Sequence, residues 1–204
     1  MGDVSNKTLA ILVGVAIVVS LIGLLSVGRG GITYLTGMSG SGTGPVSVNL
    51  SSEVSILITS SIDFGNGRVN STNPNATLDS DANTVVGGSW TPVQKYIKVE
   101  NDGTVNISVN VSADGNNRAA GLIGGTNPLF QLKGVATEAS SCVTLGTTYT
   151  NVPNSTEAPF NICDRLRFGK TNDEFNVSAL VAIPSDAGTG QRNATLTFSA
   201  SQVS

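Results

Sequence analysis

Cys142 and Cys163 are the only cysteines in the sequence, and a thiol is the side chain best suited to covalent chemistry. A cysteine nucleophile needs a base to activate it, and the chain contains no histidine. The absence of histidine also removes the commonest general base and the commonest metal ligand. We therefore predict that Cys142 and Cys163 form a disulfide, that the protein is not an enzyme, and that it has no small-molecule substrate.

Three oxygen-bearing side chains at alternate positions, Asp79, Asp81 and Asn83, have the spacing that opens a calcium-binding loop. The rest of an EF-hand is missing, because Thr84 stands where a glycine is needed and Trp90 where a bidentate glutamate is needed. An ordinary polar loop is the simpler interpretation. We therefore expect no cofactor, with calcium at this loop as the alternative.

The motif Asn-x-Ser/Thr, which accepts Asn-linked sugars, recurs along the chain. Within the runs 104–112, 176–183 and 193–200 its asparagine lies opposite the apolar residues, where a sugar has room. The alternative is that solvent-exposed strand faces simply favour Asn and Thr, so that the motifs carry no sugar. We predict that N-linked glycans are present on some of these sites, which are Asn49, Asn70, Asn75, Asn106, Asn110, Asn154, Asn176 and Asn193.

The sequence from Leu9 to Val27 is almost entirely apolar. As a helix it would span about 28 Å, close to the thickness of the hydrocarbon core of a bilayer. We predict a signal-anchor helix that holds the protein in the membrane. A cleaved signal peptide is the alternative, because Ser26-Val27-Gly28 resembles a cleavage motif of small residues.

A type IV pilin or archaellin also begins with an apolar helix. The processing site of those subunits is absent, because Lys7 is followed by Thr8 rather than by glycine or alanine. The glutamate that they carry early in the helix is missing too. Gly28, Gly30 and Gly31 then end the helix where a pilin helix would continue. A type IV pilin-like subunit therefore stays a third alternative for the function.

Composition places the remainder of the chain outside the cytoplasm and away from nucleic acids. Charged residues make up 12% of the sequence, and the net charge is −3, so there is no basic surface for nucleic acid. Residues 1–36 form the hydrophobic segment, 37–44 a flexible Gly/Ser linker, and 45–204 one extracytoplasmic domain. An isolated pair of cysteines in an exported domain is typical of a disulfide. We predict an extracellular or cell-surface location, either membrane-anchored or secreted.

Apolar and polar residues alternate with period two in most of the domain, as in strands that bury one face. The pattern predicts an all-β fold, an antiparallel β-sandwich of jelly-roll or Ig-like type, preceded by one hydrophobic helix. The runs 93–100 and 104–112 read as a hairpin joined at Asp102-Gly103. The expected core includes Val105, Ile107, Val109, Val181, Ile183, Leu196 and Phe198.

The stretch from Trp90-Thr91-Pro92-Val93 through Asn101-Asp102-Gly103-Thr104 to Val109 carries a resemblance to a known family. It resembles the hairpin of TasA/camelysin-type biofilm-fibre subunits, to which archaeal bundling pilins are similar. The resemblance implies a jelly-roll sandwich that polymerises when an N-terminal strand inserts into the next subunit. Those subunits lose their signal peptide, whereas the apolar span of this chain is expected to stay.

The residues of such a strand are present, because Val46, Val48 and Leu50 alternate with polar residues behind the glycine-rich linker. We therefore predict a structural subunit of an extracellular filament or cell-surface assembly, which self-associates by strand donation. The strand could instead complete the sandwich of its own chain. The alternative function is a monomeric, membrane-anchored adhesion or binding module.

Overall fold

The computed structural model of the protein describes residues 6–27, 47–92, 94–115 and 118–204. The chain consists of two compact units, Met1–Asn49 and Leu50–Ser204. The second unit begins close to the domain boundary expected at residue 45. The expected linker 37–44 and Val46 of the expected donor strand lie outside the described residues.

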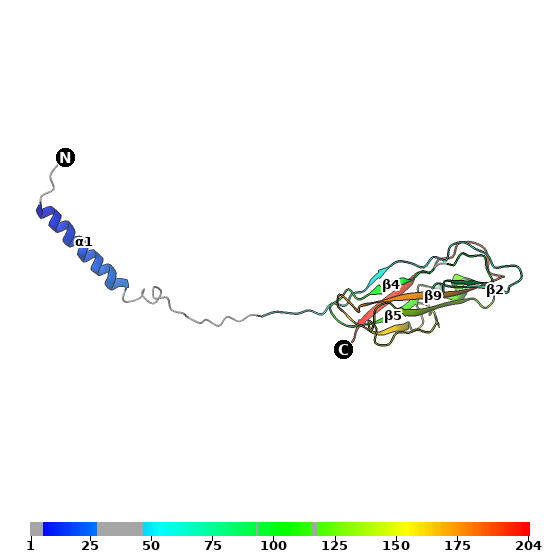
Figure 1. The fold of residues 1–204 in the computed structure, drawn as a ribbon. Helices are drawn as coiled ribbons and strands as arrows, with labels where there is room; N and C mark the ends of the chain where they lie inside the picture. The colour runs from blue at the N-terminus through cyan, green and yellow to red at the C-terminus, as the bar shows by residue number, and fades with distance from the viewer. Residues whose placement is uncertain (1–5, 28–46, 93, 116–117) are drawn as a thin grey trace, which may run out of the picture. The chain divides into compact units, whose positions relative to one another are not determined.

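The first unit contains the helix α1 (Asn6–Val27), which agrees with the expected N-terminal hydrophobic helix (Figure 1). Its described side chains, those of residues 7, 8 and 10–18, are exposed, including Ile11 and Leu12. Where side chains are described, no helix is both long enough and apolar enough to cross a membrane. The expected span from Leu9 to Val27 extends beyond those side chains, so membrane anchoring stays a prediction.

The second unit is built mainly of two antiparallel sheets. The large sheet has seven strands arranged around β9 (Glu174–Pro184). One edge of β9 pairs first with β4 (Ile97–Glu100) and then with β2 (Asn75–Asp79), and β6 (Leu129–Ala136) pairs along its other edge. Three short strands complete the sheet, namely β1 (Leu57–Thr59) beside β4, β3 (Thr84–Val86) beside β2 and β7 (Thr150–Asn151) beside β6.

The small sheet has three strands in the order β10 (Leu196–Gln202), β5 (Ile107–Ala113) and β8 (Phe160–Leu166). Figure 1 shows β5 and β9 in separate layers. A single turn of helix, α2 (Ala119–Leu122), lies between β5 and β6 in the chain.

One hydrophobic core fills the space between the two sheets. Ile107, Val109 and Val111 of β5 are fully buried, and the polar residues between them are not. Leu132 and Phe175 are fully buried members of the same core from the large sheet. The predicted all-β fold with antiparallel sheets is therefore confirmed, and period-two alternation is the correct signal for it.

The hairpin expected from 93–100 and 104–112 does not form. β4 pairs within the large sheet and β5 within the small sheet, so the chain between them crosses from one sheet to the other. The reason lies at Asn101, whose side-chain amide donates hydrogen bonds to the carbonyl oxygens of Leu166 and Arg167 at the end of β8. The turn residues therefore make a corner between layers rather than a turn within one sheet.

Some strands and core positions also differ from expectation. Val54, Ile56 and Ile58 also recur at alternate positions, which predicts a strand, but only the three-residue β1 forms there, and residues 51–56 have no regular structure. Four residues expected in the core are only half-buried, because they lie near the rims of the sheets. These residues are Val105, Ile183, Leu196 and Phe198.

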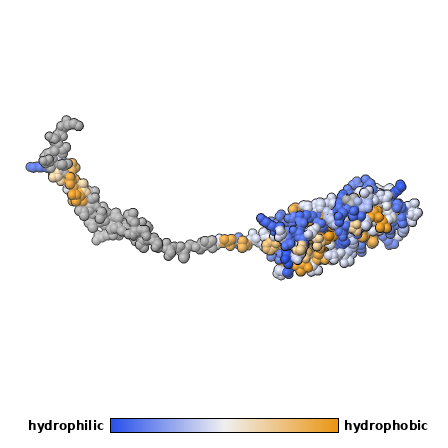
Figure 2. Space-filling view, in the orientation of Figure 1, coloured by the Kyte–Doolittle hydropathy of each residue, from blue (hydrophilic) through white to orange (hydrophobic). Residues whose placement is uncertain are grey.

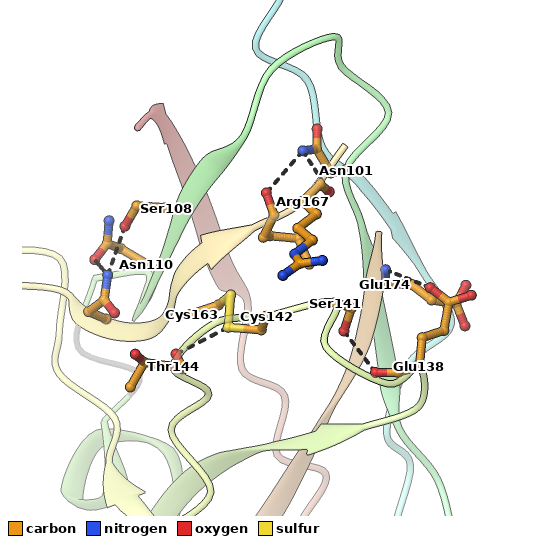
Figure 3. The surroundings of a disulfide bond; sticks show 12 residues. Asn101, Ser108, Asn110, Glu138, Ser141, Cys142, Thr144, Cys163, Arg167 and Glu174 are labelled. Atoms are coloured by element: carbon orange, nitrogen blue, oxygen red, sulfur yellow. Dashed lines mark hydrogen bonds between the residues drawn. A yellow bond between two sulfur atoms is a disulfide. The ribbon is translucent and has the colours of Figure 1, made fainter. Parts of the chain in front are cut away.

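The predicted disulfide between Cys142 and Cys163 is confirmed, with Cα atoms 5.9 Å apart (Figure 3). It ties the segment before β7 to β8, and loop closure of this length contributes on the order of 3 kcal/mol. Antiparallel bridges join Cys142 to Leu166 and Leu145 to Cys163. The outer edge of β8 is thus covered by a segment that the disulfide fixes in place. Such a bond fits an oxidising location.

Candidate functional site

The outer edge of β10 is the most open feature of the small sheet. β10 pairs with β5 along its full length, and no strand of residues 47–92, 94–115 and 118–204 pairs with its other edge. Two backbone hydrogen bonds flank this pairing, from Asp114 N to Thr195 O and from Val203 N to Asn106 O, and they show which facing residue pairs are hydrogen-bonded. In an antiparallel ladder, hydrogen-bonded pairs alternate with pairs that are not hydrogen-bonded. The backbone N–H and C=O groups of Leu196, Phe198 and Ala200 therefore point away from β5.

An apolar groove runs beside this open edge, between the two sheets. We name it the β10 groove, and its volume is about 320 Å³. Ile58 of β1 and Ile97 of β4 line its large-sheet side, and Leu196 and Phe198 of β10 line its small-sheet side. Phe130, Ala179 and Val181 form part of its floor from the core. The sandwich is therefore not closed on the side where β1 and β10 lie.

The two edges of the small sheet thus differ. At β8 the disulfide-bonded segment satisfies the backbone, for example through the bond from Val143 N to Arg165 O. At β10 no described strand pairs with the outer edge, and the groove beside it stays open. Natural proteins usually cover or blunt such an edge, because an unpaired strand edge is a template for another strand.

Residues 47–56 precede β1 and contain no helix or strand. Within them Val48 is 76% exposed and Leu50 is 89% exposed. Figure 2 shows apolar surface on the stretch of chain that directly precedes the domain. Two of the three side chains expected to form the donor strand are therefore exposed and outside every described strand. Val46 is not described.

The chain is fixed to the sandwich a few residues after Leu50. Glu53 N donates to Thr104 Oγ1 at 2.9 Å, and Thr104 N donates to Glu53 O at 3.0 Å. We call this the proximal end of the sandwich. β10 also ends here, because Val203 N bonds to Asn106 O close to Thr104. β10 therefore begins at the opposite end of the sandwich, which we call the distal end, and runs to the proximal end.

The sequence pattern does not identify all residues of the groove. Ile62 and Phe64 line it, and they continue the period-two pattern of Ile56 and Ile58. The period-two pattern therefore extends through residues 56–64, but Ser60 interrupts the strand with a φ of 65°. A residue in this left-handed region ends a β-strand, so the pattern continues beyond the element.

Asp79 and Asp81 of the calcium candidate belong to a polar cluster, in which other groups of the protein donate hydrogen bonds to the two carboxylates. Asp79 Oδ1 accepts hydrogen bonds from the backbone N–H of Asp81 and from the Tyr149 hydroxyl. The ammonium of Lys133 lies 2.7 Å from Asp81 Oδ2 and 4.5 Å from the centre of the Tyr149 ring. In the described part of the chain, no three Cys, Asp or Glu side chains converge on a metal position. Asn83 adopts a φ of 54° in the turn from β2 to β3, so the segment serves as a hairpin turn.

Replacing Asp81 by asparagine is expected to lower the free energy of unfolding at pH 7 by about 1 kcal/mol. The hydrogen bond from Lys133 is the main cause that holds the pKa of Asp81 below its ordinary value of 3.8. A depressed pKa stabilises the folded state above the ordinary pKa, and this stabilisation is lost as the pH falls through the folded value. The difference between wild type and Asp81→Asn should therefore shrink between pH 5 and about pH 2.

Urea denaturation across this range measures the effect. The same substitution at the exposed Asp164, for which the described residues show no ion pair, is the matched control. A difference between wild type and Asp81→Asn that does not change with pH would contradict the assignment.

The sequons lie in three kinds of surroundings. Asn49, Asn70 and Asn193 are exposed in segments outside the strands. Asn75, Asn110 and Asn176 are within β2, β5 and β9, and Asn106 directly precedes β5. Asn154 lies in a turn after β7. As expected, the asparagines of β5 and β9 are on the outer faces of their sheets, opposite the buried residues.

No protein-family model matches the sequence, and no curated protein matches it either.

Proposed function

We propose that the protein is a structural subunit of an extracellular filament or cell-surface assembly, in which residues 46–50 of one copy add as a strand to β10 of the next. The observation that carries the proposal is the open β10 edge above an apolar groove, in a chain that also exposes Val48 and Leu50. The added strand would supply backbone partners to β10 and side chains to the groove. Each subunit would then donate to one neighbour and accept from another.

The direction of the chain favours exchange between copies over insertion into its own groove. Residue 50 is close in sequence to the fixed proximal end at Glu53. Inserted in its own groove, the segment would run distal to proximal, parallel to β10. Inserted from a neighbour stacked on the distal end, it would run antiparallel to β10, in the pairing of the existing sheets. Such a contact is heterologous and propagates into a filament.

The remaining parts of the proposal concern location and chemistry. The apolar N-terminal helix would bring the chain to the membrane, and the domain would face outwards, where its disulfide is stable. The domain would be a jelly roll, as the resemblance to TasA/camelysin-type subunits implies. It would act by assembly rather than by catalysis, without nucleic acid or a metal cofactor.

Two variants with complementary defects test strand exchange. Val48→Asp with Leu50→Asp places charges on the donor, and Phe198→Asp places one in the groove. We expect wild-type full-length protein to form filaments and each variant alone to stay monomeric. A one-to-one mixture of the variants should give dimers that grow no further, because one intact donor meets one intact groove. Light scattering and negative-stain microscopy measure these states.

Val86→Asp is the matched control, because Val86 is exposed on β3 and outside the groove. It should assemble like wild type. Circular dichroism checks that each variant keeps its fold. Wild-type protein that stays monodisperse at high concentration would overturn the proposal in favour of the membrane-anchored binding module. Assembly of the donor variant alone would exclude residues 46–50 as the donor.

A further inference from the structure

The sequon Asn154-Ser155-Thr156 has a geometry that no other sequon in residues 50–92, 94–115 and 118–204 shows. The Thr156 hydroxyl donates to Asn154 Oδ1 at 2.7 Å, and Thr156 N donates to the same oxygen at 3.0 Å. Both bonds fall on the amide oxygen, which leaves the Nδ2 group without a described acceptor.

A carboxylate outside the sequon holds this turn. Glu157 Oε2 accepts a hydrogen bond from Asn154 N at 3.0 Å, and Glu157 N donates to Asn154 O at 3.1 Å. The other carboxylate oxygen of Glu157 pairs with Arg118 at 3.0 Å. The turn is therefore formed in the folded protein, not only in an unfolded chain.

The strand sequons cannot adopt this turn without unfolding. Asn176 pairs with Lys98 on one side and with Val135 on the other. Asn110 is held between two strands, and its amide oxygen accepts a hydrogen bond from Asn161 (Figure 3). In an extended strand the hydroxyl two residues later points along the same face, about 7 Å further on, and does not reach the amide.

We infer that Asn154 is preorganised in the folded domain to accept an Asn-linked sugar, whereas the sequons within the strands are not. Nδ2 would attack the anomeric carbon of a lipid-linked sugar phosphate, forming the C–N bond. The bond from that carbon to the phosphate oxygen breaks, the lipid phosphate leaves, and Nδ2 loses one proton. The inference rests on the exported location proposed above, but not on strand exchange.

There is space beside this sequon for the transferred sugar. An open hollow of about 530 Å³ is bordered by Pro153 and Glu157, which flank the sequon. Its wall combines apolar surface from Pro128 and Leu129 with the guanidinium of Arg118. Such a wall offers contact to the CH face of a sugar and a hydrogen-bond donor to its hydroxyl groups.

The test uses the purified full chain, a single-subunit oligosaccharyltransferase and a lipid-linked oligosaccharide, with site-resolved mass spectrometry. In the disulfide-intact folded protein, Asn154 should react more than about tenfold faster than Asn110 and Asn176, because those sites first require local unfolding. In the reduced and denatured chain this difference should disappear. Equal rates at Asn154 and Asn110 in the folded protein would overturn the inference.

Glu157→Ala tests the turn without changing the sequon. It should slow the reaction at Asn154 by about two- to tenfold, the worth of one hydrogen bond, and leave the exposed Asn193 unchanged. Faster reaction at Asn110 and Asn176 would reveal unfolding, and Glu157→Leu, which keeps much of the side-chain bulk but offers no hydrogen-bond acceptor, then replaces it. An unchanged rate at Asn154 in a folded Glu157 variant would refute the role of the turn. Failure of filament assembly would leave these results unaffected.

Discussion

Replacing Phe175 by alanine is expected to lower the free energy of unfolding by about 3–5 kcal/mol. Phe175 is fully buried in β9, the central strand of the large sheet, and it pairs with Val99 on one side and Ala136 on the other. Residues of two neighbouring strands hold its surroundings in place, so the cavity left by the ring cannot collapse. Urea denaturation of the full-length protein measures the loss.

Phe198→Ala is the informative comparison. Phe198 is only half-buried, because one side of it faces the β10 groove. We expect a loss of about 1–2 kcal/mol for the monomer. Thr197→Ala, on the outer face of the same strand, should cost well under 1 kcal/mol. Equal losses at Phe175 and Phe198 would mean that the groove is closed in solution, and the proposed acceptor would then be wrong.

The difference between these two phenylalanines also shows what the sequence could not supply. Alternation places Phe198 and Leu196 on the inner face of a strand, and that assignment is correct. It does not say whether the strand is central or at an edge, because this depends on which distant segments pair with it. Burial of an inner-face residue requires neighbours on both sides, and β10 has a described neighbour only at β5.

Strands β6 and β8 are among those that the local pattern does not predict, and the physical reason can be traced to particular positions. In β6 the inward positions are Phe130, Leu132 and Gly134, and the glycine breaks the apolar pattern. A Cβ at Gly134 would lie 2.4 Å from Leu145 Cδ1, so the glycine leaves space for a side chain from another segment. In β8 irregular register against β5 interrupts the alternation. Both causes are tertiary contacts, which a local pattern does not contain.

The disulfide can be predicted from the sequence alone, whereas for the polar turn the sequence predicts only part of the interaction. Pairing of Cys142 with Cys163 is predictable, because a chain with only these two cysteines has a single intramolecular pairing. The aspartates at positions 79 and 81 suggest a positively charged partner, and the structure places the ammonium of Lys133 beside Asp81. The sequence pattern indicates the charge that is needed but not its source, because Lys133 is distant in the chain.

The sequence around Asn101 suggests a hairpin, but Asn101 forms the corner between the two sheets. Asn101 is 2% exposed, and its backbone N–H donates to Asp173 O at 2.9 Å. Its side-chain nitrogen donates to Arg167 O at 3.0 Å (Figure 3) and to Val105 O at 2.9 Å. Its Oδ1 accepts from Gly103 N at 3.1 Å. One side chain therefore joins the end of β4 to the end of β8.

Asn101→Leu keeps the size of the side chain but leaves these buried carbonyl groups without a donor. Each unsatisfied group costs about 1–3 kcal/mol, so we expect a loss of roughly 2–4 kcal/mol in the free energy of unfolding. Asn101→Asp should be at least as harmful, because it turns an oxygen towards the carbonyl oxygens. Asp102→Asn, at the exposed neighbouring position, should change the stability by less than about 0.5 kcal/mol.

The corner also holds the start of the domain, which gives the prediction a second readout. Glu53 bonds to Thr104, and a Cβ at Gly103 would lie 2.5 Å from Glu53 O, so the loop and the incoming chain fit closely. Loosening the corner should therefore speed amide hydrogen exchange at Glu53 and Thr104 more than at the centre of β5. In a filament, a pulling force on the donated segment would act on the sandwich at the contact between Glu53 and Thr104. Asn101→Leu protein with wild-type stability and wild-type exchange at Glu53 would show that the corner is held by the backbone alone.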